Sequence, residues 1–305
     1  MGGELYVEGF FMLVVDAVEK TREFEYKKED FQRIVRIIYK VSGISLSARK
    51  EDMVYSRLGR RLRANGLNRF CDYLDFVAKD KDEQTVFVNA LTTNLTHFFR
   101  EEHHFVYLND VLFPEIFSKS SAINNNRIRF WSAGCSTGEE PYTLAMIWEH
   151  LKDRPLNFNY KILATDLDTN VINAGKEGIY SVDKLVPVTD EYLQWFTRTK
   201  SCTANQKQVD PKLKEYIIFK QLNLMQEWPI KGPFQLIICR NVLIYFDKET
   251  QKKLIKRYYD LLEPGGCLIL GHSESLGDNR NLFQSKGKTI FRKLGQRNVS
   301  QGKLV

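Results

Sequence analysis

The stretch of this chain best suited to chemistry is a turn that contains glycines and is followed at once by two carboxylates. Residues 131–141 read WSAGCSTGEEP and come after RIRF, a short apolar run typical of a buried strand. Gly134 and Gly138 fit a nucleotide-binding pattern, but Ser136 stands in place of its middle glycine. Glu140 would repel a pyrophosphate and attract an ammonium group, although acids also suit the first turn of any helix. The turn therefore indicates a ligand with an amino group and no pyrophosphate.

A second acid, Asp166, lies in ILATDLD at the end of the next predicted strand. A carboxylate at that place can accept hydrogen bonds from both ribose hydroxyls of an adenosine. It follows Gly134 by 32 residues, more than the roughly 20 of the usual fingerprint, and a packing turn with a surface acid would look the same. S-adenosylmethionine has an adenosine, a sulfonium and an amino-acid group but no phosphate, so it fits this polarity better than NAD.

These residues need a sheet that brings the ends of its strands together. From Arg127 the chain alternates short apolar runs with helical segments, which predicts an α/β fold with a mostly parallel, doubly wound sheet. Ligands of such sheets bind at the carboxyl ends of the strands, where Gly134 and Asp166 are expected. Residues 182–220 interrupt the alternation with a polar stretch that contains no glycine, which indicates an inserted subdomain.

The first part of the chain follows a helical pattern and is strongly basic. Apolar residues recur at spacings of three and four from Phe31 to Val41, before Gly43, a natural helix end. Between Lys20 and Phe70 there are 14 Lys and Arg against 6 Asp and Glu, so this part carries the excess behind the net charge of +7 and suits an acidic partner. The expected organisation is an N-terminal extension (1–25), disordered or partly helical, a basic helical domain (26–93), a linker (94–112), the α/β domain (113–295) with its insert (182–220), and a tail (296–305).

Composition limits the class of protein. The chain has 305 residues, 43% of them hydrophobic, which is enough for a large core. Its five cysteines are scattered and include no C-x-x-C pair, which argues against a disulfide framework or a structural zinc and suits a reducing cytoplasm. The apolar run FFMLVV near the start is far shorter than the roughly 20 residues of a membrane span and lacks the flanks of a signal peptide.

Several motifs, in order along the chain, carry a resemblance to a known family. The segments are ALTTNLTHFFRE, RFWSAGCSTGEEPYTLAM, ILATDLD, GIYS, QLNL, LIICRNVLIYFD and LLEPGGCLILGHSESL. Together they resemble the CheR-type family of S-adenosylmethionine-dependent chemoreceptor glutamate methyltransferases, over residues 31–294. The resemblance implies a class I methyltransferase sheet with a small β insert behind an all-α N-terminal domain. It also implies that the product is a methyl ester on receptor glutamates, formed in chemotaxis adaptation.

The resemblance further implies roles for individual residues. Arg100 would orient the incoming carboxylate and Tyr245 would line the path of the methyl group, although a lone aromatic at that position is more often a core residue. The linker residues would reach over the cofactor, although helix capping and a surface arginine give the same pattern. The residues expected to bind the cofactor are Asn94, Thr96, Arg100, Gly134, Glu140, Asp166, Asn223, Leu224, Cys239 and Arg240.

The expected reaction needs neither a general base nor a metal. A glutamate carboxylate has an ordinary pKa of about 4.3 and is ionised at neutral pH, so it can attack the sulfonium methyl directly and yield S-adenosylhomocysteine. The tasks left to the enzyme are alignment of nucleophile, methyl and sulfur, and removal of water from the carboxylate. The five histidines show no recognisable metal-ligand spacing, and we expect no metal.

The basic helical domain would face the acidic methylation helices of receptors. Arg57, Arg60, Arg61 and Arg63 crowd one helix and would steer such a partner, more weakly at high salt, unless they form an ordinary solvated face. Contact with a membrane would be indirect, through the receptors, and we expect a cytoplasmic monomer. Family members that bind a receptor's C-terminal pentapeptide carry a glycine-bearing loop in the insert. This chain lacks that glycine, so we expect it to be pentapeptide-independent.

Three other functions stay open from the residues alone. A nucleic-acid methyltransferase would suit the basic domain. However, CRNVLIYF contains neither the Asn/Asp-Pro-Pro-aromatic motif of adenine-amino methylases nor the Pro-Cys nucleophile of cytosine methylases, so we expect no nucleic-acid partner. A regulator that binds the cofactor without catalysis would have no need of Arg100 and Tyr245, which are both present. An NAD oxidoreductase would share the ribose acid but would need the middle glycine and an acid/base pair.

Overall fold

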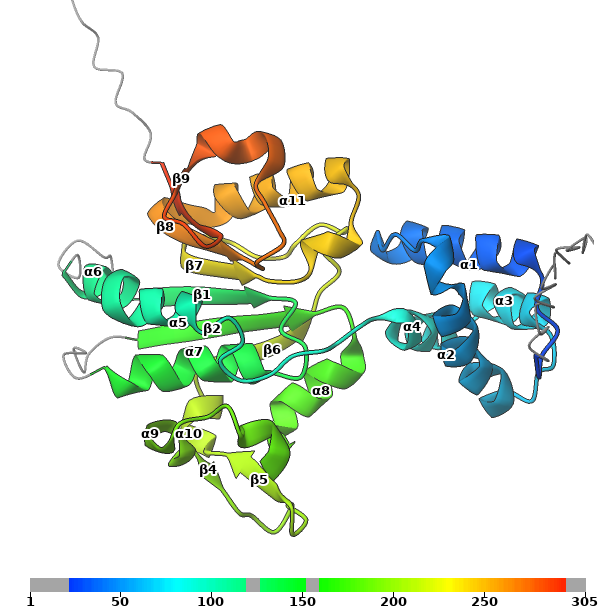
Figure 1. Ribbon diagram of the computed structural model, residues 1–305, viewed down its shortest axis with the longest axis horizontal. Helices are drawn as coiled ribbons and strands as arrows, with labels where there is room; N and C mark the ends of the chain where they lie inside the picture. Colours follow the sequence, from blue (N-terminus) through cyan, green and yellow to red (C-terminus); the bar gives the residue numbers. More distant parts are fainter. Residues whose placement is uncertain (1–21, 119–126, 152–158, 295–305) are drawn as a thin grey trace, which may run out of the picture.

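The computed structural model of the protein describes residues 22–118, 127–151 and 159–294. These residues form two lobes, a small helical one and a large one built around a sheet, joined by a link (Figure 1). The predicted α/β, doubly wound fold behind an all-α N-terminal domain is confirmed. The predicted tail (296–305) and most of the predicted extension (1–25) lie outside the described residues.

The small lobe is a helical bundle with its own apolar cluster. In α1 (Lys28–Ser42), the side chains of Phe31, Ile34 and Ile38 are buried at the predicted spacing. The helix ends where expected, because Gly43 adopts a left-handed conformation (φ 75°) and its N–H closes a hydrogen bond to the last turn. The remaining elements of this lobe are η1 (Ala48–Lys50), α2 (Glu51–Ala64), α3 (Phe70–Lys79) and α4 (Lys81–Leu91).

Residues 22–25 also belong to the small lobe, so the boundary expected at residue 26 is too late. Phe24 is buried in the apolar cluster of the lobe, and Glu25 pairs with Arg69 in an isolated parallel β-bridge. The N–H of Phe70 donates to the carbonyl of Glu25 at 3.0 Å. A single buried aromatic residue ahead of the first helix has no periodicity, and for that reason the helical pattern does not reveal this segment.

The main sheet of the large lobe has seven strands in the order β6-β2-β1-β7-β8-β10-β9. Strands β6, β2, β1, β7 and β8 run parallel, whereas β10 pairs antiparallel with both β8 and β9. The direction in which the chain adds strands reverses between β1 and β7, and doubly wound sheets bind ligands at such a switch point. The strands are β1 (Arg127–Ala133), β2 (Asn159–Asp166), β6 (Ile217–Gln221), β7 (Phe234–Cys239), β8 (Leu262–Leu270), β9 (Phe283–Ser285) and β10 (Ile290–Lys293).

Helices cover both faces of this sheet, as a doubly wound fold requires. Side chains alternate between the faces: Phe130 of β1 packs in one apolar cluster, whereas its neighbour Trp131 packs in the other. Because both faces are covered, the central strands read as continuous apolar runs. The helices are α7 (Glu139–His150) and α8 (Thr169–Glu177) on the Phe130 face and α11 (Lys248–Leu261) on the Trp131 face, with the short turns η6 (Leu243–Tyr245) and η7 (Gly277–Leu282).

The predicted linker (94–112) is shorter than expected, because its second half is helix that packs on the sheet. Phe105, Leu108 and Leu112 are buried in the same apolar cluster as α7. The large domain therefore begins near residue 103 rather than at residue 113, and the link spans residues 92–102. The consecutive helical segments are α5 (His103–Tyr107), the π-helical turn η2 (Leu108–Leu112) and α6 (Phe113–Ser118).

The insert is a three-stranded antiparallel sheet in the order β3-β5-β4, and its limits differ from the predicted residues 182–220. It starts earlier, with β3, and ends earlier, because β6 already pairs with β2 in the main sheet. Short apolar runs on either side of a polar stretch do not reveal which sheet they join. The elements of the insert are β3 (Ile179–Ser181), η5 (Val182–Leu185), α9 (Asp190–Leu193), β4 (Phe196–Thr197), β5 (Gln206–Val209) and α10 (Pro211–Lys214).

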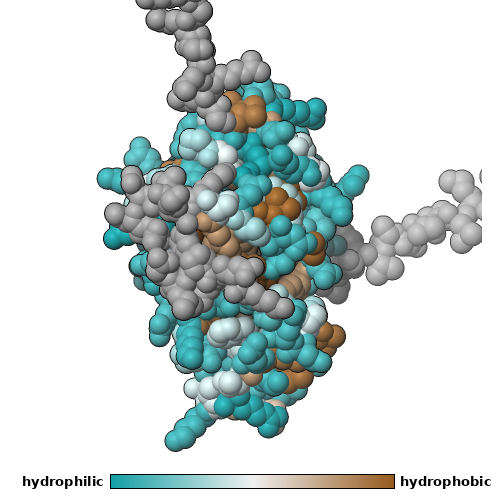
Figure 2. All heavy atoms as spheres, turned by 90° about the vertical axis from the view of Figure 1, so that its left-hand side faces the viewer, coloured by the Kyte–Doolittle hydropathy of each residue, from teal (hydrophilic) through white to brown (hydrophobic). Residues whose placement is uncertain are grey.

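Figure 2 shows the end of the large lobe that points away from the small lobe. Among the described residues in this view, hydrophilic side chains predominate and hydrophobic ones form small, separate patches. In Figure 1 the parallel strands direct their carboxyl ends toward the small lobe. Because ligands of doubly wound sheets bind at the carboxyl ends of the strands, a ligand site is expected on the edge of the sheet that faces the small lobe.

Candidate functional site

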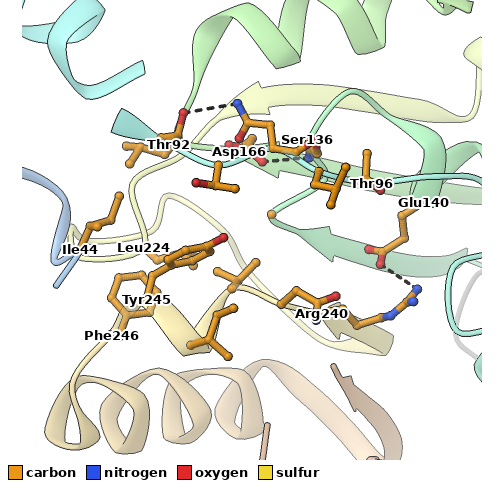
Figure 3. Close-up of a pocket in the computed structure, with 18 of the residues that line it drawn as sticks. Ile44, Thr92, Thr96, Ser136, Glu140, Asp166, Leu224, Arg240, Tyr245 and Phe246 are labelled. Atoms are coloured by element: carbon orange, nitrogen blue, oxygen red, sulfur yellow. Dashed lines mark hydrogen bonds and ion pairs between the residues drawn. The ribbon is translucent and has the colours of Figure 1, made fainter. Parts of the chain in front are cut away.

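A pocket lies at the carboxyl edge of the main sheet, between the large lobe, the link and the small lobe (Figure 3). Its cavity volume is about 370 Å³. Loops after β1, β2, β6, β7 and β8 line one side of the pocket, and the link and the small lobe line the other. The pocket therefore occupies the switch point at which ligands of doubly wound sheets bind.

Most residues selected from the sequence meet at this pocket. Those that line it are Asn94, Thr96, Arg100, Gly134, Glu140, Asp166, Asn223, Leu224, Arg240 and Tyr245. Those that do not are Cys239 and four arginines of α2, namely Arg57, Arg60, Arg61 and Arg63. The structure thus brings together the predicted cofactor residues from the link and from four strand ends.

The turn between β1 and α7 needs its glycines for backbone reasons. Gly134 has a φ of 85° and Gly138 of 98°, and a Cβ on Gly134 would lie 2.3 Å from a side-chain atom of the loop after β7. Ser136, which replaces the expected middle glycine, also has a positive φ of 48°. Its N–H donates to Asp166 at 2.9 Å, and its hydroxyl donates to the carbonyl of Asn94 at 2.8 Å. Ser136 therefore ties the turn to β2 and to the link, a role that the sequence analysis missed.

Asp166 ends β2 with its carboxylate beside this turn (Figure 3). One carboxylate oxygen accepts a hydrogen bond from the N–H of Ser136, and the other accepts one from the N–H of Asp168 at 3.0 Å. Burial raises the pKa of Asp166, and the backbone hydrogen bonds oppose that rise. Each carboxylate oxygen can accept a second hydrogen bond, so an acid held in this way suits a pair of ligand hydroxyls.

Glu140, at the start of α7, lies at the far end of the pocket (Figure 3). Its carboxylate accepts a hydrogen bond from the hydroxyl of Ser132 at 2.6 Å and pairs with the guanidinium of Arg240 at 3.2 Å. The side chain is 12% exposed, and burial raises the pKa of Glu140 although Arg240 and Ser132 lower it. The neighbouring Glu139 is fully buried and pairs with Lys184 of the insert at 2.7 Å. Of the two glutamates, Glu140 alone lines the pocket, and it suits an ammonium group.

Arg240 joins the α7 carboxylate to the link. It pairs with Glu101 at 3.4 Å and donates to the carbonyl of Arg100. Glu101 in turn lies 2.8 Å from the Nδ1 atom of His272, in the loop after β8. Phe99 and Glu101 both have a φ of 55°, a conformation that costs non-glycine residues energy and has to be held by contacts. Arg240, Glu101 and His272 therefore hold the turn that presents Arg100 to the pocket.

The same turn contains a cluster of possible metal ligands. Within the described residues, Glu101, His103 and His104 offer ligand atoms that lie within 4.8 Å of one another. His104 is fully buried, its Nε2 atom lies 2.8 Å from the carbonyl of Lys288, and burial followed by the charge of Arg240 lowers its pKa to about 4. Because Arg240 already pairs with Glu101, this group is better explained as an ion-pair network than as a metal site.

The link lies along the pocket, and hydrogen bonds anchor it before and after Thr96. Thr92 and Asn94 both donate to the carboxylate of Asp168 at 2.8 Å. Further along, Arg100 donates to the carbonyl of Leu95 at 2.8 Å. These bonds fix the path of the backbone past Thr96 and place the link where a bound ligand would be covered.

The loop after β6 supplies a wall of the pocket and joins the two lobes. Asn223 donates to the carbonyl of Val41, in the small lobe, at 2.6 Å, and accepts a hydrogen bond from the N–H of Met225 at 2.9 Å. Leu224 is buried and lines the pocket with apolar surface. This wall suits a flat, partly apolar ring.

Tyr245 belongs to η6, and its hydroxyl points into the pocket (Figure 3). The ammonium of Lys50, from the small lobe, lies 5.4 Å from the centre of its ring. Glu274 holds the turn in place, and burial raises the pKa of this carboxyl although hydrogen bonds oppose the rise. Glu274 stands within the motif GHSESL, and its sequence position alone does not predict this role. The backbone N–H groups that donate to Glu274 belong to Asn241, Val242, Ile244 and Gly271.

Cys239 differs from the other residues expected to bind the cofactor. Its side chain is fully buried and accepts a hydrogen bond from the hydroxyl of Tyr258, on the α11 face of the sheet, at 3.3 Å. Successive side chains of a strand alternate between faces, so Cys239 turns away from the pocket while Arg240 enters it. The structure therefore does not support a side-chain contact between Cys239 and a ligand.

Two of the α2 arginines expected to face an acidic partner are paired inside the small lobe. Arg61 donates two hydrogen bonds to the buried carboxylate of Glu83 at 2.7 and 2.9 Å. Arg63 pairs in the same manner with Glu23 at 2.7 and 2.9 Å. Their charges are neutralised locally, which a count of basic residues along one helix does not show.

The other two arginines of this set differ from each other. Arg57 donates to the carbonyl of Thr92 and so helps to hold the start of the link. Arg60 is exposed, and in the part of the chain that the structure describes it has neither a hydrogen bond nor an ion pair. Of the four predicted receptor-facing arginines, Arg60 is therefore the one whose charge is fully available.

Five residues of the small lobe line the cofactor pocket, a contribution that the sequence does not predict. Four of them lie at or after the turn that ends α1, where no periodic pattern is long enough to interpret. The structure places these four there because the loop after α1 packs against η6, with the N–H of Ser45 donating to the carbonyl of Tyr245 at 2.8 Å. The lining residues of this lobe are Ser42, Ile44, Leu46, Lys50 and, at the end of α4, Leu91.

Across residues 22–118, 127–151 and 159–294, no helix has both the length and the apolar character that crossing a membrane requires.

Comparison with known proteins agrees with the geometry of the pocket. A family model described as "CheR methyltransferase, SAM binding domain" matches residues 94–292, and one described as "CheR methyltransferase, all-alpha domain" matches residues 29–92. Their common border falls in the link between the lobes.

Curated relatives match along most of the chain. It is 40% identical to chemotaxis protein methyltransferase 2 of Pseudomonas aeruginosa over 275 residues. This aligned region covers 88% of this chain and 95% of that protein. It is 39% identical over 259 residues to the chemotaxis protein methyltransferase of Borreliella burgdorferi, with coverages of 84% and 91%. For the chemotaxis protein methyltransferase of Escherichia coli the identity is 38% over 279 residues, with coverages of 90% and 94%. The chain therefore belongs to the CheR family of S-adenosylmethionine-dependent methyltransferases.

Proposed function

We propose that this protein transfers the methyl group of S-adenosylmethionine to glutamate side-chain carboxylates of chemoreceptors, as a step of chemotaxis adaptation. The observation that carries the proposal is a pocket with two unlike ends. Its inner end, at the β1–α7 turn and the end of β2, holds the acids Glu140 and Asp166; its outer end, formed by the link, η6 and the small lobe, carries Arg100, Tyr245 and Lys50. An acidic inner end suits an amino-acid ammonium, and a cationic outer end suits an incoming carboxylate.

The residues of the inner end fit S-adenosylmethionine. Glu140 would pair with the ammonium of its amino-acid group, and Asp166 would accept hydrogen bonds from its ribose hydroxyls. Leu224 would lie against the adenine with Asn223 beside it, and the link would cover the ligand. When bound, S-adenosylmethionine supplies an electrophilic methyl group on a sulfonium sulfur.

At the outer end the task of the chain is to align and desolvate a carboxylate. A glutamate carboxylate with a pKa of about 4.3 is ionised at neutral pH, so no proton has to be removed from it. Arg100 would orient one carboxylate oxygen toward the methyl group, and Tyr245 would exclude water from the path. The carboxylate oxygen forms a bond to the methyl carbon as the carbon–sulfur bond breaks, which yields a glutamate methyl ester and S-adenosylhomocysteine.

The small lobe would bind the acidic segment of the receptor. Residues 20–70, most of which belong to this lobe, include 14 basic residues against 6 acidic ones. Since Arg61 and Arg63 are paired internally, we assign the steering of the partner to exposed charges such as Arg60. The attraction is expected to weaken as salt is added.

We further propose a cytoplasmic monomer that works without a receptor pentapeptide. All five cysteines are free, which suits a reducing compartment. No glycine occurs between Gly178 and Gly232, where pentapeptide-binding members of the family carry a glycine-bearing loop. Calorimetric titration with a receptor C-terminal pentapeptide should give no binding heat, and saturable binding would overturn this part of the proposal.

Transfer of a radiolabelled methyl group from S-adenosylmethionine to membranes that contain chemoreceptors tests the main proposal. We expect label on the receptor band, and base treatment should release it as methanol, because the product is an ester. Label on RNA or DNA would contradict the proposal in favour of a nucleic-acid methyltransferase. Binding of the cofactor without transfer to any partner would contradict it in favour of a regulator.

A further inference from the structure

Two apolar side chains face solvent at the mouth of the pocket. Leu95, in the link, is 80% exposed, and Ile244, in η6, is 50% exposed. Both line the pocket, Leu95 from the link and Ile244 from η6 of the large lobe. Single exposed apolar residues are normal on a protein surface, but two that line one pocket offer area that a partner can bury.

The exposure of Leu95 and Ile244 is built into the backbone. The carbonyl of Leu95 accepts a hydrogen bond from Arg100, and the carbonyl of the residue before it accepts one from Ser136, both at 2.8 Å. The N–H of Ile244 donates to Glu274 at 3.3 Å. Because the segments on both walls are held in this way, the two side chains are presented outward before any partner arrives, which lowers the entropy cost of binding.

We propose that Leu95 and Ile244 bind an apolar side chain of the protein substrate next to the target glutamate, an inference that rests on the proposed function. A carboxylate that passes these exposed side chains meets Arg100 and Lys50, which line the same pocket and supply the complementary charge. The backbone of the target residue then stays outside, against Leu95 and Ile244. The partner that covers Leu95 and Ile244 is therefore the segment of the substrate that carries the target glutamate.

The surface also defines which glutamates are accepted. On a helical substrate, residues three and four positions from the target lie on the same face as the target itself. An apolar residue at one of those positions would be covered by Leu95 and Ile244. A charged residue at one of those positions would lose its water on binding without gaining a partner. A target glutamate with such a charged neighbour would therefore be methylated poorly.

Substitutions at the mouth test this inference against a matched control. Leu95→Ala and Ile244→Ala should each raise the KM for a receptor substrate about tenfold, as expected for the loss of most of a buried aliphatic side chain. Leu95→Met, which keeps the apolar area, should restore the KM. The dissociation constant for S-adenosylhomocysteine, measured by calorimetry, should stay within about twofold of wild type in all three variants, because the change is at the mouth. Val106→Ala is the control, since Val106 is also 50% exposed but lies on α5 outside the pocket.

The outcomes separate this inference from the proposed function. If the wild-type enzyme transfers no methyl group to the receptor, the proposed function fails. If it does, and Leu95→Ala leaves the receptor KM unchanged or weakens cofactor binding equally, this inference alone is overturned. A receptor in which an apolar residue three or four positions from the target is changed to aspartate should be a poor substrate for wild type. That penalty should shrink with Leu95→Ala, and an unchanged penalty would overturn the inference as well.

Discussion

The inner and outer ends of the pocket differ in how far their groups are satisfied by the protein itself. At the inner end the side chains of Arg240, Glu101 and Glu140 are 3%, 11% and 12% exposed, and Arg240 pairs with both carboxylates. At the outer end, among the described residues, Leu95 faces solvent. The ammonium of Lys50 has no carboxylate partner within these residues and lies over the ring of Tyr245. The inner end is complete before a ligand arrives, and the outer end is left to be completed by one.

The difference follows from the sizes of the two ligands. A small cofactor is surrounded by the protein, so the charges that recognise it are desolvated and have to be paired in its absence. A protein substrate brings its own surface to the mouth, so residues there can stay exposed until they are covered. Changes at the inner end should therefore act mainly on stability and cofactor affinity, and changes at the outer end mainly on the protein substrate.

The largest effect is expected from Arg240→Ala at the inner end. Removal of this guanidinium leaves the carboxylates of Glu140 and Glu101 buried together and frees the turn that presents Arg100. Breaking a buried pair in this way should lower the free energy of unfolding by about 3 kcal/mol, and we expect cofactor affinity to fall by about a hundredfold. Chemical denaturation and calorimetry with S-adenosylhomocysteine measure the two quantities.

Arg292→Ala is a matched control for that variant. The side chain of Arg292 is 10% exposed and pairs with Glu115 at 2.7 Å, away from the pocket. It should reduce stability and leave cofactor affinity unchanged. If both arginine variants weaken cofactor binding alike, the effect of Arg240 is one of general stability and the distinction between the two ends is lost.

Next in size is the pH dependence that comes from His104. Burial lowers the pKa of His104 to about 4, from an unfolded value of 6.5, so folding favours its neutral form. The stability it contributes is complete above the unfolded pKa and is lost as pH falls from there toward the folded one. We expect this residue to account for a loss of about 2 kcal/mol in the free energy of unfolding between about pH 7 and pH 5.

His104→Gln measures that contribution, because glutamine does not titrate. The curve of unfolding free energy against pH should be shallower for the variant than for wild type over the same range. Equal slopes for wild type and His104→Gln would mean that folding does not favour the neutral form of His104.

A third effect, of similar size, is expected from Arg100→Ala, which acts at the outer end. If Arg100 orients the target carboxylate, kcat should fall by about tenfold to a hundredfold while the dissociation constant for S-adenosylhomocysteine changes much less. Arg100→Lys keeps the charge without the planar fork and should recover part of the rate. Unchanged turnover with intact cofactor binding would remove Arg100 from catalysis.

The smallest effect is expected at the surface of the small lobe. Arg60→Ala removes an unpaired exposed charge and should raise the KM for receptor membranes by about twofold to threefold at low salt and by less at high salt. Arg63→Ala, which removes an arginine already paired with Glu23, is the control and should do less. A larger effect from Arg63 would mean that its pair opens when the receptor binds.

The sequence predicts the fold and the large-lobe half of the site because the relevant residues follow strands. Gly134 and Arg240 come directly after a strand, Asp166 ends one, and Glu140 lies in the first turn of the helix that follows β1. Parallel strands bring such ends together. The same rule does not tell the two faces of a strand end apart, and this explains why Cys239 was selected with Arg240. The positions of Ile44 and Lys50 in the pocket could not be predicted from the sequence. Both residues line it only because the small lobe packs on the large one.

The roles of charged side chains were the least predictable feature. Arg61 and Arg60 are adjacent in the sequence, yet one is paired with a buried glutamate and the other is exposed. Glu274 lies four residues after β8, and its part in holding η6 depends on contacts with another loop. Such assignments require the partner residue, which lies far away in the sequence.

The division of the pocket into a cofactor end and a substrate end is tested most directly by calorimetric titration of S-adenosylhomocysteine into two variants. Glu140→Gln keeps the shape of the inner end and removes its charge, so affinity should fall by about tenfold or more. Tyr245→Phe removes a hydroxyl at the outer end and should leave the affinity within about twofold of wild type. Equal weakening by both variants, or none by Glu140→Gln, would contradict the account.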